Sequence, residues 1–236
     1  MAEPGPLAGA TWPEVAAADR RILLLPLGST EQHGPHLPLT TDTVVATRLA
    51  ELAHRRMPGV GLAPAIPYGA SGEHAHFPGT LSIGTDVLSQ LLVEFVRHAA
   101  GDWQHVLVVN GHGGNAEALA RAATLTRYEG RSLQVHHAAS GGPRADPHAG
   151  YRETCLMLHL APETVRTELA APGATAPLAE LLPRIRAGGV RAVSANGVLG
   201  DPTGADAGEG ARIFAAMADR LLDRIRALLA THRRAS

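Results

Sequence analysis

The chain has 236 residues, enough for one large domain with a substantial hydrophobic core. Its 21 basic and 22 acidic residues nearly cancel, so its charge gives no reason to expect nucleic acid or an acidic membrane surface as a partner. Every basic residue is arginine, and the absence of lysine excludes Schiff-base catalysis and a phosphate-binding P-loop. The single cysteine, Cys155, excludes a disulfide framework and a cysteine-based zinc site.

The ends of the chain and its apolar runs bear on location. The first residues carry neither a basic nor an apolar leader segment, and no uncharged apolar run approaches the roughly 20 residues that cross a bilayer. We therefore expect a cytoplasmic protein with a single domain over residues 1–236. Within it, residues 1–20 are expected to form a loose segment, and an amphipathic helix over residues 205–231 to close the chain.

Apolar strands alternate with amphipathic helices along the sequence. Continuous apolar runs predict buried strands at residues 21–27, 60–66, 105–109 and 132–138. Helical periodicity predicts helices over residues 42–57, 115–128 and 205–231 and around residues 177–186. It also predicts one helix that begins at residue 85 and another that ends at residue 160. This alternation predicts an α/β fold with a mostly parallel sheet.

Polar, glycine-rich loops follow the predicted strands. Glu31 and His33 come after the first strand, residues 71–76 after the second and His112 after the third. Ligands of parallel α/β sheets collect beyond the carboxyl ends of the strands. One edge of the sheet is therefore predicted to gather most of the chemically active side chains.

Two of these loops together supply a candidate metal site. Glu31, His33, Asp42 and His112 offer two carboxylates and two imidazoles, a set that suits borderline divalent metals such as zinc, iron or manganese. Asp42, at a predicted helix start, is the candidate to bridge two ions. Any one of these histidines could instead be an ordinary loop residue bonded to backbone, but four such residues in two glycine-flanked loops favour a metal.

Several other polar residues are candidates for catalysis or substrate binding. His148 is a candidate proton donor to a leaving nitrogen, with a helix-capping or supporting role as the alternative. Glu153 is either a further metal ligand or an ordinary acid in the first turn of a helix. Ser71 has no identifiable base partner, which argues against a serine nucleophile. The residues assigned to substrate binding are Ser71, Glu73, His74 and Gly113.

The motif NGHGGN at residues 110–115 has a competing interpretation as an anion cradle at a helix N-terminus. It lacks both the GxGxxG spacing and a lysine, so a nucleotide site is disfavoured. Its glycines are better explained as letting the backbone pass close beside a ligand.

Four blocks of the sequence together resemble the creatininase family of amidohydrolases. They are GSTEQHGPHLPLTTDT (28–43), GASGEHAHFPGT (69–80), NGHGGN (110–115) and HAGYRET (148–154). The resemblance implies a three-layer α/β/α sandwich with a mostly parallel sheet, two divalent metal ions per subunit (Fe²⁺, Zn²⁺ or Mn²⁺) and a homo-oligomer, often a hexamer. It also implies that Glu31, Asp42 and His112 hold one metal and that His33 and Asp42 hold the other.

Three later blocks are similar to the mycofactocin-system branch of this family. They are RYEGR (127–131), APLAELLPRIRAGGV (176–190) and NGVLGDPTGA (196–205). Enzymes of that branch cut a peptide bond, which implies a short modified precursor peptide as substrate and a released Val-Tyr dipeptide. Because these blocks lie outside the metal motifs, we expect them to distinguish branches rather than chemistry.

The chain departs from the family pattern at two positions. Gly114 stands where creatininases carry a glutamate ligand, so a ligand is expected from elsewhere, with Glu153 the best candidate. Cys155 stands where serine is usual.

The function expected from these residues is metal-assisted hydrolysis of an amide or peptide bond by an activated water. One alternative is a creatininase-type hydrolase of a small cyclic amide or a formamide. An alternative of another class is a non-catalytic metal-binding subunit of a biosynthetic complex.

Overall fold

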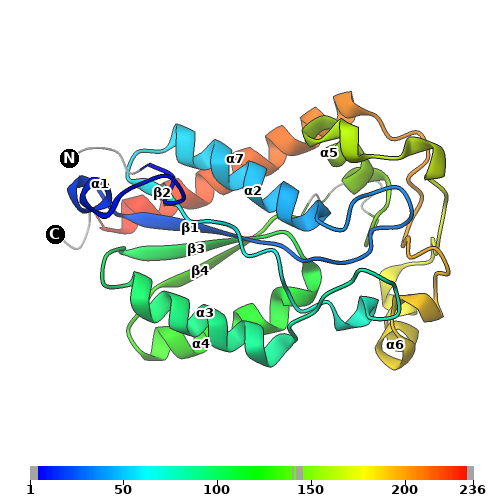
Figure 1. The fold of residues 1–236 in the computed structure, drawn as a ribbon, viewed down its shortest axis with the longest axis horizontal. Coiled ribbons are helices and arrows are strands. Elements are labelled where there is room, and N and C mark those ends of the chain that lie inside the picture. The colour runs from blue at the N-terminus through cyan, green and yellow to red at the C-terminus, as the bar shows by residue number, and fades with distance from the viewer. Residues whose placement is uncertain (1–4, 140, 142–145, 233–236) are drawn as a thin grey trace.

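The computed structural model describes residues 5–139, 141 and 146–232 (Figure 1). Its central sheet has the strand order β2-β1-β3-β4, and every neighbouring pair is parallel. The strands are β1 (Ile22–Leu27), β2 (Val60–Leu62), β3 (His105–Asn110) and β4 (Leu133–His137). The predicted α/β fold with a parallel sheet is confirmed.

Helices cover both faces of this sheet. One face carries α2 (Thr41–Arg56), α5 (Tyr151–Leu160) and α7 (Ala207–His232), and the other carries α3 (Thr85–Ala99) and α4 (Ala116–Tyr128) (Figure 1). The result is the three-layer α/β/α sandwich that the family resemblance implied.

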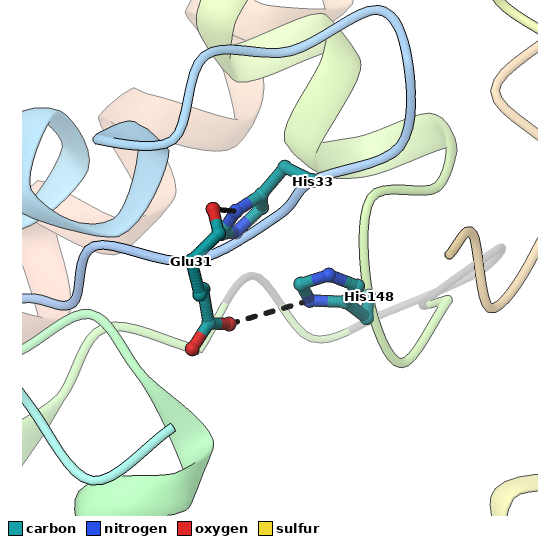
Figure 2. Close-up of side chains that lie close together, drawn as sticks. All are labelled: Glu31, His33 and His148. Atoms are coloured by element: carbon teal, nitrogen blue, oxygen red, sulfur yellow. Dashed lines mark hydrogen bonds and ion pairs between the residues drawn. The ribbon is translucent and has the colours of Figure 1, made fainter. Parts of the chain in front are cut away.

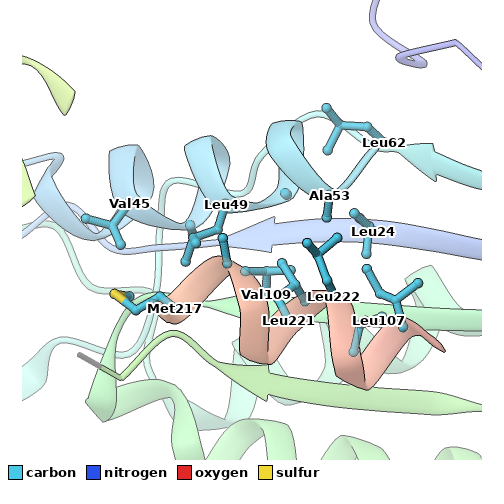
Figure 3. Packing of buried hydrophobic residues seen from close by; sticks show 14 of the residues in the cluster. Leu24, Val45, Leu49, Ala53, Leu62, Leu107, Val109, Met217, Leu221 and Leu222 are labelled. Carbon is cyan, nitrogen blue, oxygen red and sulfur yellow. The ribbon is translucent and has the colours of Figure 1, made fainter. Parts of the chain in front are cut away.

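Strand β1 is buried from both sides, which explains its continuous apolar sequence. Ile22 and Leu24 pack into the cluster that α2, α5 and α7 cover, whereas Leu23 and Leu25 pack into the cluster under α3 and α4. Successive side chains of a strand point to opposite faces, so a strand between two helical layers has no polar face. Figure 3 shows the first of these clusters, in which Leu24 lies among side chains of α2 and α7.

The order of the strands creates a switch point between β1 and β3. From β1 the chain passes through α2 to β2 on one side, and then through α3 to β3 on the other side. The loops that follow β1 and β3 therefore leave the sheet toward different layers and open a crevice between them. Leu27 and Asn110 are the last register pair of these two strands, so both loops start at the same edge of the sheet.

Two segments differ from the sequence expectation. Strand β2 ends at Leu62 rather than residue 66, although Ile66 still forms an isolated bridge with Leu27. The described part of the N-terminal segment, expected to be loose, contains the short helix α1 (Trp12–Ala17). The Leu7 amide donates to the Leu62 carbonyl at 2.9 Å, which attaches this segment to the edge of the sheet.

The region after α5 contains short helices and one longer helix. These are η3 (Pro162–Thr164), η4 (Thr167–Leu169), α6 (Leu178–Gly188) and η5 (Val190–Ala192). A small separate apolar cluster of Leu181, Val190 and Leu199 holds this region together. Among the residues that the structure describes, no helix has the length and apolar character needed to span a membrane.

Candidate metal centre

Glu31 lies at the centre of a group of imidazole rings beyond the end of β1. Its side chain is completely buried, and Oε2 lies 3.1 Å from Nε2 of His112 while Oε1 lies 3.4 Å from Nε2 of His74. Neither carboxylate oxygen accepts a hydrogen bond of normal geometry from any described residue. A buried carboxylate without such donors is costly, and a bound cation would satisfy it.

Asp42, in the first turn of α2, lies between two histidines. Its Oδ1 accepts from Nε2 of His33 at 3.2 Å, and its Oδ2 lies 3.2 Å from Nδ1 of His112. The Ser29 hydroxyl donates to Oδ2 at 2.6 Å. The helix start thus fixes one carboxylate so that its two oxygens face two different imidazoles.

Three groups of side chains in this region have a geometry that could hold a metal ion, each with ligand atoms within 4.8 Å of one another. The chemistry of these donors, carboxylate oxygen and imidazole nitrogen, fits a borderline divalent ion. Figure 2 shows the Glu31 carboxylate pointing toward the ring of His148, while the main-chain carbonyl oxygen of Glu31 faces the ring of His33. The groups are Glu31 with Asp42 and His112, His33 with Asp42 and Glu153, and Glu31 with His33 and His148.

His148 and Glu153 come from a tight turn and the helix that follows it. His148 is buried, and its Nδ1 lies 3.8 Å from Oε1 of Glu31 (Figure 2). The next residue, Ala149, has a positive φ of 52°, an uncommon conformation for a residue with a side chain. The Ala149 amide donates to Oε2 of Glu153 at 2.5 Å, so this acid supports the first turn of α5 and also faces His33 and Asp42. The position of Glu153 is therefore compatible with either role expected from the sequence, a further metal ligand or an acid in the first turn of a helix.

The residues assigned to substrate binding lie around His112. Nε2 of His112 is 3.5 Å from the hydroxyl of Ser71 and 3.6 Å from Oε1 of Glu73. His74 is buried on the other side of Glu31. Gly113 lines a cleft of about 350 Å³ beside the centre.

That cleft connects the candidate metal ligands to the surface. Asp42, His112 and Glu153 line it, together with His137 at the end of β4. His137 is exposed, and its Nδ1 lies 3.2 Å from the side-chain amide nitrogen of Asn110. A substrate that enters this cleft would therefore meet the carboxylates and imidazoles at its base.

Two glycines of the NGHGGN motif are required by close packing. A Cβ on Gly111 would lie 2.3 Å from the Asp42 carbonyl. A Cβ on Gly114 would lie 2.3 Å from Nε2 of His112 and 2.5 Å from Oε1 of Glu73. At Gly113, by contrast, an added Cβ would meet no described atom within 4 Å.

The paired groups favour one another's charged forms, so the pKa values of the two carboxylates fall and those of two imidazoles rise. Burial alone would raise the pKa of Glu31, but the interactions with His112 and His74 together outweigh burial and lower that pKa to about 2. Burial would also raise the pKa of Asp42, but His33 and His112 hold it well below the usual value. Burial alone would lower the pKa of His33, but the Asp42 carboxylate raises it to about 10. In the same way Glu31 and Asp42 raise the pKa of His112 well above its usual value.

For three neighbouring groups, His74, His148 and Glu153, the pKa shifts instead favour the neutral form. Burial and the charge of His33 hold the pKa of His148 well below its ordinary value. Burial lowers the pKa of His74 to about 4 and raises the pKa of Glu153 to about 7. The centre thus contains strongly paired charges next to imidazoles that stay neutral at pH 7.

Two features of this site were not singled out from the sequence. Gln32, between Glu31 and His33, is only 5% exposed and lies within hydrogen-bonding distance of both His74 and His148. The segment 196–201 packs against the same region, since Leu199 pairs with His148 in an antiparallel bridge. The sequence carried no signal for either feature, because the burial of Gln32 and the contact at Leu199 both depend on chain segments that are far apart in the sequence.

These features define an α/β/α protein with a buried candidate metal centre of carboxylates and imidazoles at the switch point of a parallel sheet. The family model described as Creatininase, creatinine amidohydrolase, matches residues 8–225, and the chain belongs to this family.

Relatives and solved structures give the same result. The chain is 52% identical over 210 residues to the mycofactocin precursor peptide peptidase of Mycolicibacterium smegmatis, covering 87% of this chain and 84% of that protein. It is 30% identical over 210 residues to the creatinine amidohydrolase of Pseudomonas putida, covering 73% and 79% respectively. A crystal structure of creatinine amidohydrolase superimposes with a TM-score of 0.77 at 26% identity, covering 95% of this chain and 97% of that one. Similar solved structures are described as a manganese creatininase and a zinc–zinc type. The predicted family and its mycofactocin-related branch are confirmed.

Proposed function

We propose that this protein is a metal-dependent peptidase that acts on a short modified precursor peptide. The observation that carries this proposal is the 52% identity, over 87% of the chain, to a protein named mycofactocin precursor peptide peptidase. A second such peptidase, from Mycobacterium tuberculosis, is 51% identical over 94% of the chain. The bond cut is the one that releases the C-terminal Val-Tyr dipeptide, as the resemblance of the later sequence blocks implies.

The proposed cofactor is a pair of divalent ions, Fe²⁺, Zn²⁺ or Mn²⁺. One ion would be held by Glu31, Asp42 and His112, and the other by His33, Asp42 and Glu153, which are two of the groups with suitable geometry. Asp42 belongs to both groups and would bridge the ions. When bound, such ions polarise a carbonyl oxygen and lower the pKa of water to near neutrality.

His148 is proposed to move the proton that the reaction requires. Hydrolysis forms a C–O bond to water and breaks the C–N bond, and one water proton must reach the leaving nitrogen. The Nδ1 atom of His148 is 3.8 Å from Glu31, and its low pKa keeps the ring neutral before reaction. A neutral imidazole can accept this proton and then donate it to the departing amine.

The cleft beside Asp42, His112 and Glu153 is the proposed entry for the peptide. Ser71, Glu73, His74 and Gly113 are proposed to contact the substrate near the scissile bond. A homo-oligomer, a hexamer by family resemblance, and a cytoplasmic location are proposed as well; they rest on the family resemblance and on the sequence.

The test is to incubate the purified protein with the modified precursor peptide and, separately, with creatinine. Release of a dipeptide, detected by mass spectrometry, is expected only from the peptide. A chelator should abolish release, and added Zn²⁺ or Mn²⁺ should restore it. The variant Glu31→Gln should be inactive, whereas Glu163→Gln, which changes an exposed carboxylate, should retain activity.

Two alternatives remain as outcomes of this test. Turnover of creatinine without cleavage of the peptide would identify a hydrolase of small cyclic amides, which the 30% identity to the Pseudomonas putida enzyme favours less strongly. Bound metal without turnover of either compound would indicate a non-catalytic subunit.

A further inference from the structure

Gln32 forms the centre of a hydrogen-bond network that joins two histidines to a distant loop. Its side-chain nitrogen lies 2.8 Å from Nδ1 of His74, 3.0 Å from Nε2 of His148 and 3.1 Å from the carbonyl oxygen of Gly197. Its side-chain oxygen accepts from the Gly34 amide at 2.9 Å. Because Gly34 offers a donor and Gly197 an acceptor, the orientation of the Gln32 amide group is fixed.

A count of protons then fixes the tautomer of His148. Its Nε2 lies 2.8 Å from the main-chain carbonyl oxygen of Gln32, which can only accept. A neutral ring must therefore carry its proton on Nε2 and donate it to this carbonyl. The Nδ1 atom of His148, which faces Glu31 at 3.8 Å, is consequently left with a free electron pair.

The same count fixes the tautomer of His74. The amide nitrogen of Gln32 has two protons and three neighbours, but Nε2 of His148 already carries a proton. The two amide protons therefore go to Nδ1 of His74 and to the Gly197 carbonyl. His74 then carries its own proton on Nε2, which lies 3.4 Å from Oε1 of Glu31.

We propose that Gln32 is a positioning residue that holds the His74 proton on Nε2, facing Glu31, and leaves Nδ1 of His148 as an acceptor at the reaction centre. Through Gly197 it also ties the segment 196–201 to the site. Leu199 in that segment exchanges two backbone hydrogen bonds with His148, at 2.9 and 3.4 Å. Segment 196–201 thus contacts the site through Gln32 and His148 rather than through the residues proposed to hold the two ions.

The packing around Gln32 shows that this arrangement leaves little freedom. A Cβ on Gly197, which has a φ of 82°, would lie 1.9 Å from Oε1 of Gln32. Gln32 itself is 5% exposed. Its close packing and its hydrogen bonds restrict Gln32 to the observed amide orientation, and this orientation determines the tautomers of the two histidines.

The test compares Gln32→Met and Gln32→Glu with the matched control Gln90→Met, which changes an exposed glutamine on α3. Nitrogen-15 spectra of the zinc-loaded and metal-free proteins identify which ring nitrogen of each histidine carries a proton. In the unchanged protein both His74 and His148 are expected to carry it on Nε2. In Gln32→Met the His74 ring should lose its single tautomer. In Gln32→Glu the new carboxylate should draw the His74 proton to Nδ1.

Kinetics give the second readout. Because supporting partners of active-site groups typically contribute about 10- to 100-fold, kcat should fall by about this factor in both Gln32 variants. KM and the metal content should stay near the values of the unchanged protein. The control Gln90→Met should match the unchanged protein in every measurement.

The two readouts separate failure of this inference from failure of the proposed function. The ring-nitrogen signals need no substrate, so they test the network even if the peptide is not cleaved, whereas the kcat comparison rests on the proposed function. A proton on Nδ1 of His148 in the unchanged protein would overturn the proposal, and so would unchanged His74 signals in folded Gln32 variants. If neither variant folds, the spectra of the unchanged protein still decide the tautomers.

Discussion

Binding of metal to this site should release protons, because the imidazoles that would hold the ions are protonated without them. The Asp42 carboxylate raises the pKa of His33 to about 10, and the pKa of His112 lies well above its usual value. Both rings are therefore charged at pH 7 in the metal-free protein. A nitrogen that binds a metal must first give up its proton, so loading of both positions should release about two protons from these rings. Glu153, whose pKa is raised to about 7, should release a further fraction of one proton at pH 7.

The same linkage sets the pH dependence of affinity. The raised pKa values mean that protons compete with metal throughout the range below pH 10, so the apparent affinity should fall as the pH falls. With at least two protons released, the overall constant for loading both positions should change at least about 100-fold per pH unit. Isothermal titration calorimetry with Zn²⁺ in two buffers of different ionisation enthalpy measures the number of protons directly.

A pair of variants makes this experiment decisive. His33→Ala removes one protonated ligand and should reduce the release by about one proton, whereas His98→Ala, which changes an exposed histidine on α3, should leave the release unchanged. Binding of Zn²⁺ without any proton release would refute the reasoning. It would mean that the carboxylates are not paired with charged imidazoles in the metal-free protein.

Three further predictions follow from the geometry. Asp42→Ala should lose both metal ions, because Asp42 belongs to two candidate groups, while Glu153→Gln should lose only one; metal analysis after gel filtration measures this, and two ions retained in Glu153→Gln would contradict the assignment. Gly114→Ala should lower the free energy of unfolding by about 1–3 kcal/mol through overpacking, whereas Gly113→Ala, at an open position, should change it little; urea unfolding compares the two, and equal effects would refute the packing argument. Leu49→Ala removes a completely buried side chain of α2 and should cost about 2–5 kcal/mol in the same assay, so a cost below this range would show that the core can close around the cavity.

Most of the fold was predictable because its signals are local. The continuous apolar run that became β1 indicated a strand buried on both faces, and Ile22 and Leu23 do pack into opposite layers. The end of β2 was the part predicted wrongly, although a signal for it was present. The stretch from Val60 to Ile66 reads as one apolar run, but after the Ala63 amide donates to the Leu24 carbonyl the pairing with β1 is interrupted at Pro64, which has no amide proton to donate, and it resumes with the Ile66 amide.

The members of the candidate metal centre were predictable because their residue types are specific and follow strand ends. Glu31, His33, Asp42 and His112 lie together, and Glu153 lies near His33 and Asp42 although it is far from them in sequence. Their roles as ligands remain predictions that the metal analysis would test. The family pattern suggested Glu153 as the replacement for a ligand at Gly114, where a side chain would collide with His112.

Gln32 could not be assigned from the sequence because its partners are distant. It contacts His74, His148 and Gly197, the last of which is 165 residues away. Such contacts carry no periodicity, and a glutamine has no chemistry that would single it out in a loop of carboxylates and histidines. The contact between Leu199 and His148 was hidden for the same reason.

The pairing of Leu199 with His148 has a consequence for how this family can diversify. The residues proposed to bind the ions come from the loops after β1 and β3 and from the starts of α2 and α5. The backbone contact that holds His148, the proposed proton carrier, comes instead from segment 196–201. Replacement of segment 196–201 could therefore change the rate of proton transfer, or allow a different leaving group, while the proposed metal ligands stay unchanged. A chimaera in which residues 196–201 are replaced by the corresponding segment of a cyclic-amide hydrolase would test this separation, because its metal content should be unchanged while its substrate preference shifts.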